Sequence, residues 1–191
     1  MGYKLRNLKT KDCDGMLEWM HDPQINSLYT DKIRNATSAD VLRFIEDSQI
    51  LMKQGNTYHY AIVNKDDEYL GTISLKDILP VQGAEYAISM RGGYRGKGIA
   101  SWATDEILRI AFEELKLHRV YLNVLADNEN ACRFYVRKCF RYEGESRNCI
   151  QIDGELKSLK WYAMLKEEYR ERCDHTKFME DGIEIDRERT I

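Results

Sequence analysis

The sequence has little proline, no long apolar run and no excess of positive charge. Only Pro23 and Pro80 interrupt its 191 residues, and no Gly/Ser-rich linker divides them, so we expect one domain without an internal hinge. No stretch approaches the roughly 18 consecutive apolar residues of a membrane-spanning helix, and we expect no membrane association. The net charge of −3 indicates no general affinity for nucleic acid.

Cysteine pairing and metal-ligand patterns are also absent. The five cysteines are odd in number, and none forms a C-x-x-C pair or a Cys/His ligand spacing. This pattern indicates reduced thiols in a cytoplasmic protein and predicts no metal site. The opening residues, MGYKLRNLKTKD, lack the apolar core of a secretory signal, which also favours the cytoplasm.

Apolar periodicity predicts a mixed α/β (α+β) fold. The expected order is β α α β β β α β α β β, with Thr10 and Ser38 as the N-caps of the first two helices. One β–α–β crossover lies inside an otherwise antiparallel, twisted sheet flanked by helices. We expect residues 1–168 to form this domain and residues 169–191 to form a charged tail. The expected strands are 3–8, 58–63, 69–75, 84–90, 118–125, 141–152 and 156–165, and the expected helices are 10–20, 38–53, 98–115 and 128–138.

A glycine-rich turn, RGGYRGKGIAS, occupies residues 91–101 between an expected strand and an expected helix. Free N–H groups at a helix start and glycines that admit a positive φ make such a turn suited to anions. The spacing does not fit a Walker loop, because Gly92 and Gly96 are too close and Lys97 is followed by Gly98. It also fits a dinucleotide-binding βαβ unit poorly, because antiparallel strands precede it.

A third pattern, [RQ]-x-x-G-x-[GA], is satisfied by residues 95–100, and N-x-x-[AS]-x-x-x-Y follows at residues 128–135. With both motifs in order, the chain resembles the GNAT superfamily of acyl-CoA-dependent N-acetyltransferases over about residues 70–165. The stretch EWMHDPQI is similar to the ribosomal-protein N-terminal and nucleotide-amino-sugar branches. One departure is Cys139, where the family usually has glycine; a positive φ there would cost about 1 kcal/mol.

The resemblance implies acetyl-CoA as the acyl donor, with the turn wrapping its pyrophosphate. It also implies a splayed strand that faces the pantetheine and the thioester, and an asparagine that caps the following helix and contacts the cofactor. The implied cofactor-binding residues are Ile88, Ser89, Met90, Arg95, Gly96, Lys97, Gly98, Ile99, Ala100 and Asn128.

Acetyl transfer to an amine needs a neutral amine, a stabilised oxyanion and a proton for the leaving thiolate. Tyr135, at the family's motif position, is the expected acid, because a phenol is protonated at neutral pH. Glu85, on the strand before the turn, is the expected base. Asn123 and His21 are candidate substrate-binding residues, and the region around residues 18–29 is expected to recognise the acceptor.

These residues predict direct transfer of an acetyl group to a primary amine of a small molecule such as an amino sugar. One alternative is a protein N-terminal acetyltransferase of the ribosomal-protein type, and another is a non-catalytic CoA-binding module. A homodimer formed through the late strands or the tail is a further hypothesis.

Overall fold

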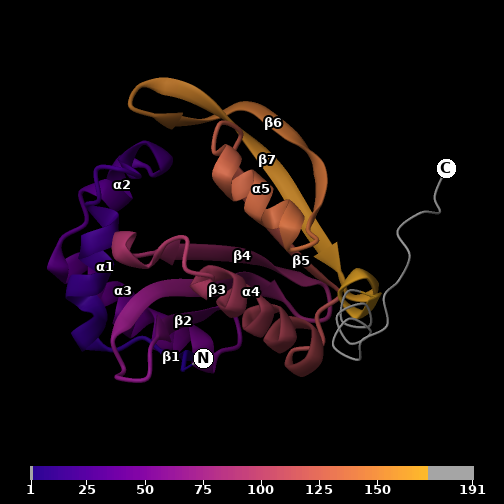
Figure 1. Ribbon diagram of the computed structural model, residues 1–191, viewed down its shortest axis with the longest axis horizontal. Helices are drawn as coiled ribbons and strands as arrows, with labels where there is room; N and C mark the ends of the chain where they lie inside the picture. The colour runs from indigo at the N-terminus through magenta and orange to yellow at the C-terminus, as the bar shows by residue number, and fades with distance from the viewer. Residues whose placement is uncertain (1, 172–191) are drawn as a thin grey trace.

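The computed structural model describes residues 2–171, so the predicted tail lies largely outside the described part. Seven strands form one sheet in the order β1-β2-β3-β4-β5-β7-β6 (Figure 1). The β4–β5 pair is parallel and the other pairs are antiparallel, which confirms the predicted mixed α/β fold. The strands are β1 (Lys4–Asn7), β2 (Tyr58–Val63), β3 (Tyr69–Leu79), β4 (Gly83–Met90), β5 (Arg119–Leu125), β6 (Arg141–Ile152) and β7 (Glu155–Leu165). The helices are α1 (Cys13–Met20), α2 (Asp31–Arg34), α3 (Ser38–Lys53), α4 (Ile99–Arg109) and α5 (Glu129–Arg137).

The starts of the first helices differ from the predictions. Thr37, not Ser38, caps α3: its Oγ1 accepts from the N–H of Asp40 at 3.3 Å, and Asp40 accepts in return from the N–H of Thr37. Thr10 begins a 3₁₀ turn instead of capping α1. The buried carboxylate of Asp12 fixes that turn, because it accepts from the Lys9 N–H and pairs with an arginine of β1. The four-residue helix α2 was not predicted.

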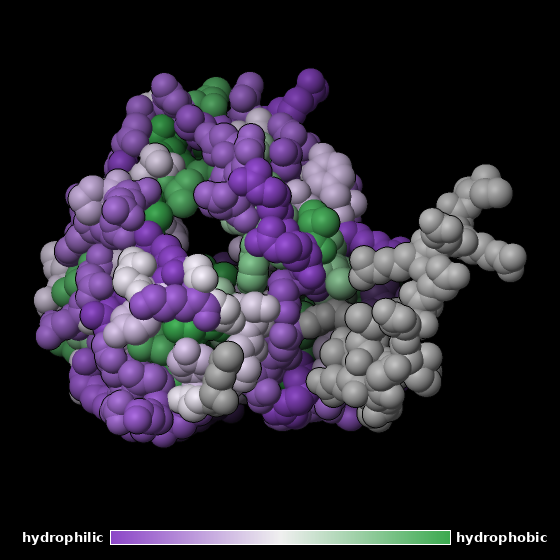
Figure 2. Space-filling model, viewed as in Figure 1, coloured by the Kyte–Doolittle hydropathy of each residue, from purple (hydrophilic) through white to green (hydrophobic). Residues whose placement is uncertain are grey.

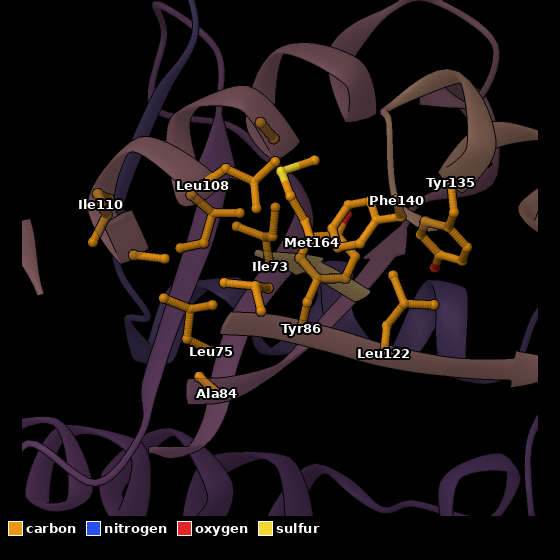
Figure 3. Packing of buried hydrophobic residues seen from close by; sticks show 14 of the residues in the cluster. Ile73, Leu75, Ala84, Tyr86, Leu108, Ile110, Leu122, Tyr135, Phe140 and Met164 are labelled. Carbon is orange, nitrogen blue, oxygen red and sulfur yellow. The ribbon is translucent and has the colours of Figure 1, made fainter. Parts of the chain in front are cut away.

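Two apolar cores lie on opposite faces of the sheet. The larger packs α4 and α5 against the central strands, and Figure 3 shows Ile73 and Tyr86 from the sheet facing Leu108 of α4. The smaller packs α1 and α3 against β2 and β3 around Ile45 and Ala61. None of the helices within residues 2–171 has the length and apolarity to cross a bilayer.

The end of the described chain belongs to the larger core. Residues 166–171 are helical, and Tyr169 stacks on Phe112 with ring centroids 4.9 Å apart. The Tyr169 hydroxyl donates to Glu113 at 2.7 Å. Phe112 and Glu113 belong to a π-helical turn, Ile110–Glu114, that continues α4 to the predicted end of that helix. The first residues of the predicted tail thus pack on the domain.

The sheet splits between β4 and β5. These strands pair only over Gly83–Glu85 and Arg119–Tyr121, whereas β5 continues to pair with β7 as far as Leu125. Beyond the paired residues, β5, β7 and α5 diverge from β4 (Figure 1). Figure 2 shows the surface deeply hollowed between the α2 side and the α5 side of the molecule. The split opens the middle of the sheet from both faces.

Candidate active site

The glycine-rich turn presents free backbone donors to open space. Gly96 and Gly98 have φ values of 73° and 77°, which glycine adopts without strain. No N–H from Gly96 to Ser101 donates a hydrogen bond to another residue within the described part of the chain. A Cβ atom at either glycine would meet nothing within 4 Å. The turn and the start of α4 therefore fit an anion such as a pyrophosphate.

The cations of the turn have different surroundings. Arg95 donates to the Met90 carbonyl at 3.1 and 3.2 Å and forms an ion pair with Asp22 at 2.9 Å. Its guanidinium is therefore held against the end of β4. Lys97 is exposed, and its ammonium lies 5.3 Å from the centre of the Tyr94 ring. The Lys97 side chain therefore lies in the same turn as the free N–H groups, without an ion-pair partner among the described residues.

Backbone groups of β4 face the split in the sheet. The Arg91 N–H donates to the Leu70 carbonyl of β3 at 3.0 Å. Because backbone groups alternate sides along a strand, those of Ile88 and Met90 point away from β3 and toward the gap. The Met90 carbonyl already accepts a hydrogen bond from Arg95. The N–H of Ile88 has no partner on β5, because Ile88 lies beyond the residues of β4 that pair with that strand. Ile88 thus offers a donor at the place where a thioester carbonyl would enter.

Tyr135, on α5, lies at the edge of the larger core (Figure 3). Its ring contacts Tyr86 edge-on at 6.0 Å and Tyr162 at 6.2 Å. Its hydroxyl forms no hydrogen bond with another described residue. Burial, together with the nearby phenol of Tyr29, raises the pKa of Tyr135 above its ordinary value. The group is therefore a protonated phenol whose O–H can be donated to a ligand.

Two features of α5 hold Tyr135 in place. Asn128 caps the helix as predicted, accepting from the Ala131 N–H at 3.2 Å. At the other end Cys139 has a φ of 66°, and its N–H donates to Val136 at 2.9 Å. The Phe140 N–H donates to the Tyr135 carbonyl at 3.0 Å. This is the ending usually made with glycine, so the helix keeps its geometry despite the cysteine.

Lys138 connects the end of α5 to α4. It follows α5, and its ammonium donates to Ser101 at 3.0 Å and pairs with Asp105 at 2.6 Å, both on α4. The lysine is only 8% exposed, so the two contacts replace most of its hydration. The N-terminal end of α4 and Tyr135 of α5 are thereby held in a fixed relative position.

The predicted base and one predicted substrate residue lie together. Glu85 accepts from Lys76 at 2.8 Å and from the side-chain amide of Asn123 at 3.3 Å. Its carboxylate is therefore part of an ion pair. The other candidate, His21, is bound by its Nε2 to the Ala36 carbonyl at 2.9 Å. It does not line the cavity on the face of the sheet that carries α1 and α3.

A cavity of about 420 Å³ lies on the face of the sheet that carries α1 and α3. It ends on β4, at Ala87, Ile88 and Ser89, so it meets the split from the side opposite Tyr135. Most of its wall is apolar, and its size suits a small ligand. The remaining lining residues are Met16, Trp19, Met20, Thr30, Lys32, Ile33, Ala36, Asp40, Val41, Phe44, His59, Thr72, Ser74 and Lys76.

Two polar residues at this site were not singled out from the sequence, although Tyr29 ends the stretch of residues 18–29 that was expected to recognise the acceptor. The hydroxyl of Tyr29 lies 3.1 Å from Ser89 Oγ, at the β4 end of the cavity. His59 of β2 lines the cavity wall, with its Nδ1 2.7 Å from Ser74 Oγ. His59 shares a strand face with the buried Ala61 and Val63, and a histidine in such an apolar alternation is the signal that could have identified it.

An anion site at a helix start, a split sheet and a small cavity that meet on one strand define an acyl-CoA-dependent transferase. Residues 3–139 match the family model described as "Acetyltransferase (GNAT) domain". The chain belongs to this family of acetyltransferases, with acetyl-CoA as the acyl donor, as the two sequence motifs predicted.

Individual relatives agree with this assignment. The chain is 26% identical over 172 residues to the uncharacterized N-acetyltransferase p20 of Bacillus licheniformis, covering 86% of this chain and 93% of the relative. It is 32% identical over 105 residues to the putative ribosomal N-acetyltransferase YdaF of Bacillus subtilis (strain 168), covering 54% and 57%. A Vibrio cholerae spermidine N-acetyltransferase, solved with CoA and spermine, has the same fold, with a TM-score of 0.78, 21% identity and coverage of 88% and 98%.

Proposed function

We propose that the protein transfers the acetyl group of acetyl-CoA directly to the primary amine of a small molecule, with an amino sugar as the first candidate. The observation that carries the proposal is the meeting of two sites on β4. The glycine-rich turn and Tyr135 lie on one side of the split, and the cavity ends on the other side, at Ile88 and Ser89. An amine in the cavity would face a thioester laid along the strand.

Each of the predicted site residues has a separate role in the acetyl transfer. Acetyl-CoA supplies an activated acyl group, and the turn around Gly98 binds its pyrophosphate. The Ile88 N–H donates to the carbonyl oxygen as negative charge develops there. A C–N bond forms, the C–S bond breaks, and the Tyr135 hydroxyl gives its proton to the leaving sulfur. Glu85 takes a proton from the amine through a water molecule, with Lys76 and Asn123 fixing the carboxylate.

A contact between α2 and the turn that joins β6 to β7 supports a small acceptor over a peptide. The β6–β7 turn reaches α2, where Arg34 binds Asp153 with a donor–acceptor distance of 3.0 Å. This contact links segments 119 residues apart, and Figure 1 shows the turn between β6 and β7 beside α2. A protein N-terminus would need an open groove, so the ribosomal-protein type of acetyltransferase is the second candidate. It is supported by the similarity to YdaF and by the likeness of the stretch EWMHDPQI to the ribosomal-protein branch.

The test is a turnover screen, read by release of the CoA thiol, against amino sugars, nucleotide-linked amino sugars, polyamines, amino acids and peptides. We expect an amine-dependent rate with a small acceptor, confirmed by mass spectrometry of an N-acetylated product. Preference for peptides would favour the second candidate. A protein that binds acetyl-CoA but acetylates none of these amines would support the non-catalytic alternative.

Location and assembly are part of the same proposal. Four thiols within the described residues, Cys13, Cys132, Cys139 and Cys149, are free, which supports a cytoplasmic enzyme. The proposed homodimer is tested by light scattering of the purified protein: a mass of twice 22.5 kDa supports it, and a single-chain mass argues against it.

A further inference from the structure

The inner wall of the cavity carries no carboxylate. Its buried polar residues are His59, Thr72 and Ser74. The acid that lines the cavity, Asp40, is exposed and is already bound to Thr37. Glu85 does not line the cavity and is paired with a lysine. A cationic group deep in this cavity would therefore lose its hydration without gaining an anionic partner.

The imidazole of His59 is held in one place within this wall. The residue is 8% exposed. Its Nδ1 is bonded to Ser74, and the Phe44 ring packs against it at an interplanar angle of 61°, with centroids 4.8 Å apart. Burial and the nearby Lys76 lower the pKa of His59 to about 4, so the ring is neutral at pH 7. A neutral ring has one donor and one acceptor nitrogen.

The second ring nitrogen of His59 has no partner in the described protein. The hydroxyl of Thr72, in contrast, is bound to Tyr69 at 2.7 Å, and Tyr69 accepts from Trp19 at 3.0 Å. The Nε2 atom is therefore the polar atom of the inner wall that remains for a ligand. Buried polar atoms are nearly always hydrogen-bonded in native proteins, either to the protein, to water or to a ligand.

On the basis of the acetyl transfer proposed above, we propose that His59, oriented by Ser74, determines acceptor specificity by hydrogen-bonding to a hydroxyl or carbonyl oxygen of the acceptor. The acceptor class is a hydroxylated amine with a single amino group, and polyamines are excluded. A second ammonium would lie on the apolar wall near Lys76, where the nearby carboxylate, Glu85, is already paired with that lysine. The reacting amino group would lie at the β4 end, beside Ser89.

The experiment compares acceptors and variants. Wild-type protein, His59→Gln, His59→Phe and the control His118→Gln are assayed with amino sugars and with spermidine. His118 is exposed and does not line the cavity. We expect the wild type to use a hydroxylated amine at least about 10-fold more efficiently than spermidine, because one lost hydrogen bond in a closed site has an effect of this size.

The variants separate recognition from folding. His59→Phe should lower kcat/KM for the hydroxylated acceptor about 10-fold and leave acetyl-CoA affinity unchanged, whereas His59→Gln, which retains a hydrogen-bonding group, should lose less. If His59→Phe does not fold, the test rests on the KM of His59→Gln for the hydroxylated acceptor. A KM higher than that of His118→Gln supports the proposal, and an equal KM overturns it. If the wild type prefers spermidine, the proposed specificity for a hydroxylated amine is wrong, but the proposed acetyl transfer still holds. Absence of turnover with every amine overturns the proposed function itself.

Discussion

Replacing Cys139 with glycine should stabilise the protein without changing its activity. The residue has a φ of 66° at the end of α5, a conformation that costs a residue with a Cβ atom about 1–2 kcal/mol. Glycine loses more backbone entropy on folding, by about 0.5–1 kcal/mol. The side chain is exposed, so little packing is lost. The balance predicts a gain of about 0.5–1 kcal/mol, or about 1–4 °C in Tm for a domain of this size.

Calorimetric or urea unfolding of Cys139→Gly and Cys139→Ala measures this gain. The alanine variant is the matched control, since it removes the thiol but keeps the strained φ. We expect alanine to behave like the wild type and glycine to be more stable than both. A glycine variant no more stable than alanine would refute the reasoning and would mean that α5 ends differently, without the hydrogen bond from Phe140 to the Tyr135 carbonyl.

Two further predictions concern Tyr135 and His59. Tyr135→Phe should lower kcat by about 100-fold or more and leave acetyl-CoA affinity and Tm nearly unchanged, because the hydroxyl has no hydrogen-bond partner in the described protein; an unchanged kcat in steady-state assays would remove it from the mechanism. The lowered pKa of His59 means that the unfolded state binds a proton more readily than the folded state between about pH 6.5 and 4. The unfolding free energy of the wild type should therefore fall, relative to His59→Gln, by up to about 1.4 kcal/mol per pH unit as the pH drops through this window. Parallel urea titrations at several pH values check this, and identical pH profiles would contradict a buried neutral imidazole.

The sequence predicted the parts of the site that depend on local structure. The positive φ values of Gly96 and Gly98, the cap formed by Asn128 and the helix that carries Tyr135 all follow from residues close together in the chain. The two family motifs, at residues 95–100 and 128–135, are short because each describes residues of a single turn or helix. The parallel crossover near the middle of the sheet was also predicted, because a helix connects the two strands that form it.

The parts that were missed depend on contacts between distant segments. Thr10 failed to cap α1 because Asp12 pairs with Arg6 of β1, a contact that helix propensity does not contain. The bond between His59 and Ser74 depends on the register of two strands, and the cavity depends on how α1 and α3 pack on them. The ion pair that restrains Glu85 arises in the same way, from Lys76 on the opposing strand.

The central claim is that the glycine-rich turn binds acetyl-CoA, and titration calorimetry of the wild type and Gly98→Asp tests it most directly. The aspartate would place a carboxylate in the open space beside the free N–H groups, at a φ of 77° that also favours glycine. We expect micromolar or tighter binding of acetyl-CoA to the wild type and no detectable binding to a folded Gly98→Asp. Equal affinity of the two proteins would contradict the assignment of the turn, and absence of binding to the wild type would contradict the account as a whole.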